Sequence, residues 1–189
     1  MKCVIVGNLA IRHEKIGKKR RTGLGGSYYA AVAAARLGCE TTVISKVSNS
    51  FPQKYLKLLK KEKVTLIKQP AWQDTKYEVE YFKDGTKTVK MLSEAGEISS
   101  IPNITCDVAH IASYYCKIGL DVIKTLRKNS TQLSLDAQSF VKYKNPDSTV
   151  SYVPWLEKEE FLKNVDILKI NARELYYLTG KQTVNSAIE

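Results

Sequence analysis

Apolar runs alternate with helical segments along the first third of the chain. The expected strands are 4–6, 41–45 and 64–67, and the expected helices are 27–37 and 51–62. Alanine, the strongest helix former, dominates the first of these helices, and Gly38 follows it as a C-terminal cap. Strands that alternate with helices in this way predict a parallel sheet with helices packed on its faces.

The pattern changes to strict alternation between residues 76 and 92. Tyr77, Val79 and Tyr81 alternate with charged residues, and Asp84-Gly85 supplies a turn. We expect an antiparallel hairpin with one solvent-exposed face. Together with residues 9–22, this hairpin would form a small β lid that projects from the main domain.

The alternation of strands and helices then returns. The expected strands are 108–112, 132–135 and 166–170, the expected helices are 118–128, 155–162 and 171–179, and residues 142–151 are expected to form an exposed loop. The fold class predicted for residues 1–189 is therefore one α/β domain, with a mostly parallel sheet, helices on both faces and a small β lid.

Composition narrows the class of protein. No run approaches the roughly 18 uninterrupted apolar residues of a membrane helix, and the apolar run that follows Met1 is too short for a signal peptide. The four cysteines lie far apart, without a Cys-x-x-Cys pair, and each lies in or beside an apolar run. We therefore expect buried free thiols and a cytoplasmic protein.

The chain carries 30 Lys and Arg against 19 Asp and Glu, a formal charge of +11. The densest basic cluster, residues 15–21, could contact the phosphates of a nucleic acid. However, most other lysines lie on the wet faces of amphipathic helices, and no nucleic-acid-binding motif accompanies them. A solvated basic surface is the favoured interpretation, and nucleic-acid binding is the alternative.

Three polar features lie where predicted strands end, which is where open α/β sheets bind ligands. Gly25 and Gly26 precede the alanine-rich helix, where they either admit a ligand or allow tight packing. Asp136 follows an apolar strand and is either a ligand-binding carboxylate or a turn cap. Asn171 and Glu174 open the last long helix, either as a capping box or as oxygen donors suited to Mg²⁺ and its waters.

Taken together, these features resemble the ribokinase-like (PfkB) carbohydrate kinase family, and the resemblance covers essentially the whole chain. The segments that carry it are Gly25-Gly26-Ser27-Tyr28-Tyr29, Ala35-Arg36-Leu37-Gly38, Leu135-Asp136-Ala137-Gln138 and Asp166-Ile167-Leu168-Lys169-Ile170-Asn171-x-x-Glu174. The predicted lid also matches the family, which carries a small β lid over its sugar site.

The resemblance implies transfer of the γ-phosphoryl group of ATP to a hydroxyl of a sugar or nucleoside, assisted by Mg²⁺. It places Gly25, Gly26 and the turn from Asn8 onward in the sugar site, with Tyr28 beside the glycine pair. It places Asn171 and Glu174 beside Mg²⁺ and phosphate, through water. It assigns Asp136 to the mouth of the phosphate channel.

The chain departs from the family pattern in two places. Arg12 stands where the family commonly has an aspartate that binds sugar hydroxyls, so an acidic or phosphorylated substrate is an alternative. No segment matches the family's Gly-Ala-Gly-Asp motif, whose glycines form an anion hole and whose aspartate is the general base. The family's adenine-binding part is expected to be missing as well. We therefore expect a truncated chain that has no catalytic base and is inactive alone.

Further expectations follow from this interpretation. The partners would be a small-molecule sugar or nucleoside, and either a second copy bound through the lid or another chain that supplies the missing part. No membrane partner is expected. A non-catalytic sugar-binding or regulatory protein is the alternative to an enzyme.

Overall fold

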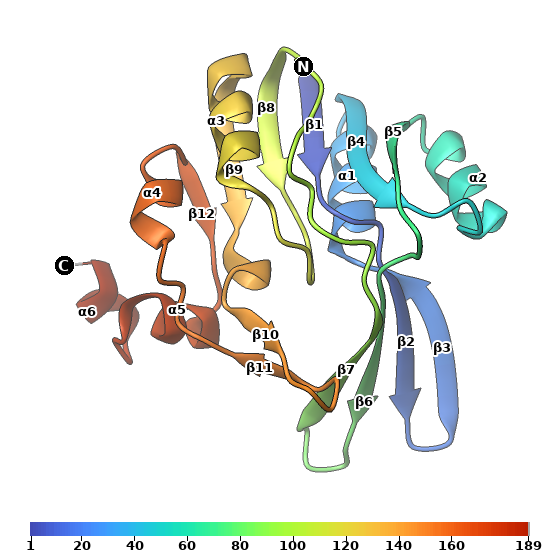
Figure 1. Ribbon diagram of the computed structural model, residues 1–189, viewed down its shortest axis with the longest axis vertical. Helices are drawn as coiled ribbons and strands as arrows, with labels where there is room; N and C mark the ends of the chain where they lie inside the picture. Colours follow the sequence, from blue (N-terminus) through green and yellow to red (C-terminus); the bar gives the residue numbers. More distant parts are fainter. Residues whose placement is uncertain (189) are drawn as a thin grey trace.

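A six-stranded parallel sheet forms the centre of the computed structural model, which describes residues 1–188 (Figure 1). Its strands, in spatial order, are β12 (Ile167–Lys169), β9 (Ser130–Asp136), β8 (Cys106–Ile111), β1 (Lys2–Val6), β4 (Glu40–Val47) and β5 (Thr65–Pro70). Every neighbouring pair is parallel. This arrangement confirms the fold class predicted from the alternation of strands and helices.

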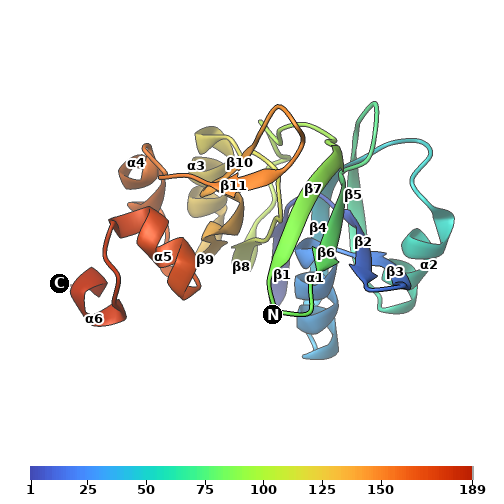
Figure 2. The same ribbon diagram turned by 90° about the horizontal axis from the view of Figure 1, so that it is seen from below.

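Helices cover both faces of this sheet, because the strands are apolar on both sides. One face packs against α1 (Gly26–Arg36) and α2 (Gln53–Lys61). The other packs against α3 (Leu120–Asn129), α4 (Lys158–Leu162) and α5 (Ala172–Thr179), and α6 (Val184–Ile188) follows α5. Figure 2 shows α1 and α3 on opposite sides of the strands.

A second sheet of four strands, called here the small sheet, projects beyond the central one (Figure 1). Its spatial order is β3 (Lys19–Leu24), β2 (Ile11–Ile16), β6 (Lys76–Tyr81) and β7 (Lys87–Ser93). The face that carries Tyr77, Val79 and Met91 is buried. The opposite face is charged, with a Lys15–Glu80 ion pair at 2.5 Å and an Arg20–Glu78 pair at 3.7 Å.

Residues 142–151 are not the loop that their polar composition predicted. They form most of a hairpin of β10 (Lys142–Lys144) and β11 (Val150–Tyr152), closed by a hydrogen bond from the Asn145 amide to the Thr149 carbonyl. The amide of Met91 in β7 donates to the Ser148 carbonyl. The hairpin is therefore ordered by pairing with the small sheet, because Ser148 lies 57 residues from Met91 and local composition does not reveal this partner.

Candidate functional site

The carboxyl ends of the parallel strands meet at one edge of the central sheet, beside the small sheet. Gly7, directly after β1, has φ of +156°, and a Cβ atom there would lie 2.1 Å from the Ala112 carbonyl oxygen. Only glycine allows β1 and the end of β8 to approach this closely. The buried Ser27 hydroxyl, at the start of α1, lies 2.9 Å from the Asn8 carbonyl oxygen and 2.5 Å from that of Ala112.

Asn8 holds this turn together. Its Nδ2 donates to the Gly96 carbonyl at 3.1 Å and to Thr75 Oγ1 at 3.4 Å, and its Oδ1 accepts from the Lys46 amide at 3.1 Å. The side chain is 2% exposed. Its hydrogen-bonding capacity is largely used within the protein, so the structure gives Asn8 a structural role at the base of the predicted sugar site.

The glycine pair separates into two environments. Gly25 is buried as the N-cap of α1, where its amide donates to the Ala10 carbonyl and an added Cβ would lie 3.4 Å from the Tyr77 hydroxyl. Gly26 is exposed, with open space where a Cβ would lie. Close packing therefore requires the first glycine, while the second leaves the start of the helix open.

The two tyrosines that follow the pair point differently. Tyr28 packs into the apolar cluster beneath α1 and has Glu62 and Arg36 as its charged neighbours. The Tyr29 hydroxyl instead lies 3.7 Å from the position of a Cβ on Gly23 in the small sheet. The structure thus places Tyr29 at the junction with the small sheet and Tyr28 beneath α1, and a substrate-binding role for Tyr28 stays a prediction.

Arg12 lies on the same face of the small sheet as Tyr77, its neighbour across the β2–β6 pair, and forms an ion pair with Glu14. Burial raises the pKa of Tyr77 to about 12, and the nearby Arg12 guanidinium opposes this rise. Arg12, Gly25 and Tyr77 therefore form one group of predicted and newly found residues at the base of the small sheet.

Tyr77 also stacks on Tyr114, which follows β8. Their ring centroids are 4.1 Å apart and nearly parallel. The ammonium group of Lys142 contacts the second ring of this pair: its Nζ lies 3.6 Å from the centroid of Tyr114. The stack connects the Arg12 group with the polar residues at the ends of β9 and β12.

Asp136, the last residue of β9, caps the short 3₁₀ helix η1 (Ala137–Ser139). Its Oδ1 accepts from the Gln138 amide at 3.0 Å, and its Oδ2 pairs with Lys169 Nζ at 3.0 Å. The turn-cap interpretation is confirmed. The carboxylate nevertheless lies at the edge where the other strand ends meet.

Asn171 and Glu174 form a complete capping box at the start of α5. Asn171 Oδ1 accepts from the Glu174 amide at 2.9 Å, and Glu174 Oε2 accepts from the Asn171 amide at 3.0 Å. Glu174 is 1% exposed. Burying a carboxylate is costly unless it is hydrogen-bonded or near a cation, so cationic side chains are expected close to Glu174.

A cavity of about 250 Å³, called here the basic cavity, lies beside this capping box. The residues that line it include Lys87, Tyr114, Lys142, Asn171, Arg173 and Glu174. They come from the small sheet, the loop after β8, the β10–β11 hairpin and α5. The cavity brings together the two residues predicted to lie beside phosphate and three cationic side chains.

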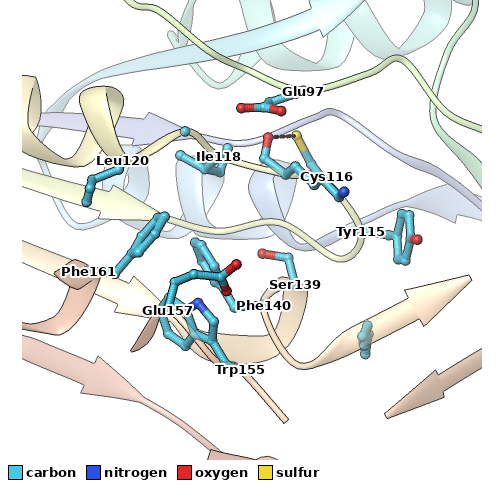
Figure 3. A pocket seen from close by; sticks show the side chains of 13 residues that line it. Glu97, Tyr115, Cys116, Ile118, Leu120, Ser139, Phe140, Trp155, Glu157 and Phe161 are labelled. Atoms are coloured by element: carbon cyan, nitrogen blue, oxygen red, sulfur yellow. Dashed lines mark hydrogen bonds between the residues drawn. The ribbon is translucent and has the colours of Figure 1, made fainter. Parts of the chain in front are cut away.

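A second cavity, of about 340 Å³, shares Lys142 with the first. Figure 3 shows the aromatic rings of Phe140, Trp155 and Phe161 along it, with the Glu157 carboxylate and the Ser139 hydroxyl pointing inward. This cavity is more apolar, and none of the site residues predicted from the sequence lines it.

The oxygen donors of the capping box limit how a metal ion could bind. Across residues 1–188, no group of three or more His, Cys, Asp or Glu side chains is arranged to hold one. One Glu174 oxygen and the Asn171 side-chain oxygen are already used in the box. Within the described residues Glu174 Oε1 has no hydrogen-bond partner, so this oxygen is available to Mg²⁺ or to one of its waters.

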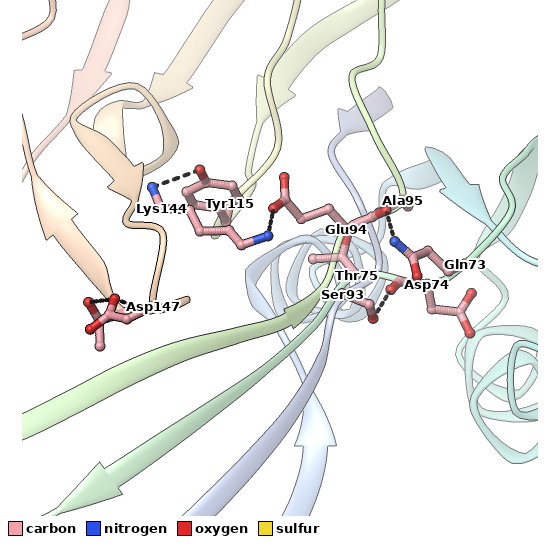
Figure 4. Close-up of polar contacts among 10 residues, drawn as sticks. Gln73, Asp74, Thr75, Ser93, Glu94, Ala95, Tyr115, Lys144 and Asp147 are labelled. Atoms are coloured by element: carbon pink, nitrogen blue, oxygen red, sulfur yellow. Dashed lines mark hydrogen bonds and ion pairs between the residues drawn. The ribbon is translucent and has the colours of Figure 1, made fainter.

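Polar contacts connect the hairpin to the point where the small sheet rejoins the domain (Figure 4). Lys144 Nζ pairs with Glu94 Oε1 at 2.9 Å, and the Lys144 amide donates to the Tyr115 hydroxyl at 2.9 Å. On the other side, Ser93 Oγ donates to the Asp74 carbonyl at 2.6 Å. Both connections of β6 and β7 are therefore tied by hydrogen bonds or ion pairs.

Sequence reasoning missed Lys142, Tyr114 and Lys87 as members of this site. Each lies in a segment of ordinary composition and reaches the cavity only through long-range pairing. One local signal was available for Lys142, which follows the Asp136-Ala137-Gln138 segment by a few residues and hydrogen-bonds to Gln138 at 3.1 Å.

Comparison with known proteins identifies the family of the chain. Residues 12–189 match the model of the pfkB family carbohydrate kinases. The chain belongs to this family. The predicted family resemblance is therefore confirmed, and no curated protein matches the chain.

Two solved structures extend the comparison within the PfkB and ribokinase group. One is a pyrophosphate-dependent kinase of the ribokinase family in complex with sulfate, which is 26% identical with a TM-score of 0.89 over 98% of this chain and 67% of its own length. Another is a pyrophosphate-dependent kinase of the ribokinase family in complex with a pyrophosphate analog and myo-inositol, 25% identical with a TM-score of 0.87 over 98% and 66%. The chain thus spans about two thirds of their length.

A more distant structure, Arabidopsis thaliana ribokinase with ribose and ATP, is 19% identical with a TM-score of 0.67 over 99% of this chain and 66% of its own. At this identity the similarity shows the fold alone.

Within residues 1–188, every helix is too short or too polar to cross a membrane.

Proposed function

We propose that the protein acts in transfer of a phosphoryl group to a hydroxyl of a sugar, nucleoside or cyclic polyol. The observation that carries the proposal is the basic cavity, which joins the Asn171–Glu174 capping box to three cationic side chains beside the small sheet. Phosphoryl transfer depends mainly on positioning and on stabilising charge, and these residues are suited to both.

On the acceptor side, the residues proposed to bind substrate are those around Tyr77. Gly26 leaves room at the start of α1, Gly25 allows the close packing of Ala10 and Tyr77 beneath it, and Arg12 offers donors to hydroxyl or anionic groups. The buried face of the small sheet, with Tyr77 and Met91, would act as a lid that excludes water from the reacting groups. Asn8 would hold the floor of this site in place.

On the donor side, Asn171 and Glu174 would hold Mg²⁺ through water, and Asp136 would lie at the mouth of the channel. The ion would neutralise part of the phosphate charge. Lys87 and Arg173 would orient the donor, since both line the same cavity. The acceptor site and this cavity meet at the Tyr77–Tyr114 stack, so an acceptor hydroxyl and a phosphate could approach there.

Two donors are candidates. ATP is the donor that the family resemblance implies, and inorganic pyrophosphate is favoured by the two similar structures of pyrophosphate-dependent kinases. For the same reason myo-inositol joins the sugars and nucleosides as a candidate acceptor. Both donors present phosphate groups to one cavity, so a direct comparison can separate them.

The test uses the 189-residue chain with Mg²⁺, either ATP or pyrophosphate, and a panel of ribose, fructose, adenosine and myo-inositol. Phosphorus NMR follows the appearance of a phosphomonoester. Transfer to any of these acceptors supports the proposal and contradicts the prediction that the chain is inactive alone. Saturable acceptor binding without transfer favours the non-catalytic alternative, and absence of both acceptor binding and transfer overturns the proposal.

The compartment and the assembly are also proposals. The four cysteines are free, which agrees with a cytoplasmic location. Binding of a second copy through the small sheet, or of a different chain, is expected to appear as a mass above 21.3 kDa in light scattering. The basic hairpin of β2 and β3 is in part neutralised by Glu78 and Glu80, which weakens the case for nucleic acid.

A further inference from the structure

Lys142 is the most enclosed cation in the site. It begins β10 and lines both cavities, so its side chain lies at the wall between them. Its ammonium group stacks over Tyr114 at 3.6 Å and lies 5.8 Å from the centroid of Tyr152. Two aromatic faces thus fix the direction of a side chain that would otherwise be mobile.

The protein leaves this ammonium group short of partners. An ammonium group has three N–H donors, and the one acceptor within hydrogen-bond distance among the described residues is Gln138 Oε1, at 3.1 Å. Among the described residues neither nearby carboxylate forms an ion pair with Lys142: Glu174 Oε2 accepts from the Asn171 amide, and Asp136 Oδ2 pairs with Lys169. Two donors of Lys142 therefore have no acceptor among the described residues.

Burial lowers the pKa of Lys142 to about 7, while Glu174 and then Asp136 oppose this shift, and Lys87 and Lys169 add to it. The protonated form is thus destabilised at this position when no anion is present. An anion in the cavity would stabilise it. A cation held by rings and a neutral amide, rather than by a salt bridge, is available to a ligand.

The rest of the basic cavity also favours an anionic ligand. Its lining contains three cations, Lys87, Lys142 and Arg173, and one carboxylate, Glu174, a net charge of +2. The three cations come from the small sheet, the hairpin and α5. A water molecule occupies roughly 30 Å³ in the liquid, so a cavity of about 250 Å³ has room for more than one phosphate group.

We propose that Lys142 is a phosphate-binding residue, whose ammonium group contacts the phosphoryl donor in the basic cavity together with Lys87 and Arg173. This inference deepens the proposed function, on which it rests for the identity of the anion as a donor. The bound anion would join the small sheet, the β10–β11 hairpin and α5, so donor binding would also hold the small sheet in place.

The experiment measures binding of inorganic pyrophosphate, ATP, inorganic phosphate and adenosine to the 189-residue chain by isothermal titration calorimetry. The variants are K142M, which removes the charge but keeps the length, and K142R, which keeps the charge. K124M, on the exposed side of α3, is the matched control. Because loss of a charged hydrogen bond typically costs 1.5–3 kcal/mol, K142M should weaken pyrophosphate or ATP binding by at least about tenfold.

K142R should bind within about threefold of the unchanged protein, and K124M should be unaltered. Weaker binding of pyrophosphate alone identifies it as the donor, and weaker binding of ATP but not adenosine identifies the nucleotide phosphates. Chemical unfolding of each variant checks that the fold is kept. If K142M does not fold, K142Q, which also removes the charge, replaces it: binding at least about tenfold weaker supports the proposal, and unchanged binding contradicts it.

Unchanged pyrophosphate and ATP affinity in a folded K142M, or no phosphate binding by the unchanged protein, overturns the inference. The phosphoryl-transfer assay is scored separately. Lys142-dependent phosphate binding with neither acceptor binding nor transfer would overturn the proposed function and leave the phosphate site standing, whereas transfer that K142M does not impair would do the reverse.

Discussion

Asn8 illustrates how a residue at a ligand-binding edge can serve the fold. Its side chain makes three hydrogen bonds with segments 38 to 88 residues away. Replacement by alanine removes all three and leaves buried partners unsatisfied, so N8A should lower the free energy of unfolding by about 1–3 kcal/mol. Urea unfolding measures this, with N103A in an exposed loop as the control.

A ligand-binding role for Asn8 predicts a different result. In that case N8A would lose acceptor affinity at an unchanged unfolding midpoint. The hydrogen bonds favour the structural outcome, in which stability falls first.

His110 gives the protein a pH-dependent stability. It lies in β8, hydrogen-bonded to Ser134 at 3.1 Å, with Asp136 and Lys169 as charged neighbours. Burial lowers its pKa below the value of about 6.5 for an exposed histidine. The unfolded chain therefore binds more protons than the folded chain in the pH range just below 6.5, and stability falls as the pH falls through this range.

The measurement compares urea midpoints at pH 7.5 and 5.5. H110Q should flatten the dependence, because it removes the buried imidazole. H13Q, which removes the other imidazole from the small sheet, should keep the slope of the unchanged protein. An equal slope in H110Q and the unchanged protein would exclude His110 as its source.

At the scale of elements, the start of α5 combines two roles that substitution can separate. N171A removes the cap and should lower the free energy of unfolding by about 1 kcal/mol, whereas N171S keeps an oxygen acceptor and should restore most of it. The serine side chain is shorter than that of asparagine, so its hydroxyl cannot reach the position that the Asn171 amide group occupies. N171S is therefore expected to regain stability but not pyrophosphate binding in the presence of Mg²⁺.

Calorimetry and urea unfolding of both variants provide this comparison. T179S, at the other end of the same helix, keeps the hydroxyl that bonds to Leu175 and serves as a control. Recovery of both properties in N171S would show that Asn171 acts through the cap alone.

The elements also show which features a sequence can predict. The capping box at Asn171, the strand end at Asp136 and the hairpin turn at Asp84-Gly85 depend on residues close in sequence, and local rules find them. The hairpin that carries Lys142 depends on pairing between Ser148 and Met91. The Tyr77–Tyr114 stack likewise joins two distant segments. Burial produced by such contacts has no local sequence pattern, so the sequence did not predict Lys142 as a residue of the site.

At the scale of the whole molecule, the β10–β11 hairpin connects the donor side of the site to the small sheet. Lys142 begins the hairpin, and Lys144, two residues on, pairs with Glu94 just after β7. The backbone bond from Met91 to Ser148 lies between the same elements. The position of the small sheet and the shape of the basic cavity should therefore depend on each other.

K144M tests this connection, because it removes the ion pair and leaves the Lys144 amide bonded to Tyr115. A partly exposed ion pair contributes about 0.2–1 kcal/mol, so amide hydrogen exchange in β7, β10 and β11 should become up to about fivefold faster. Exchange in β1 and β8 should stay the same, as it should throughout K124M. E94Q should reproduce K144M, and the double variant should add little, since both changes break one contact. Faster exchange spread evenly over the central sheet would instead show a general loss of stability and would argue against a specific connection between the small sheet and the phosphate site.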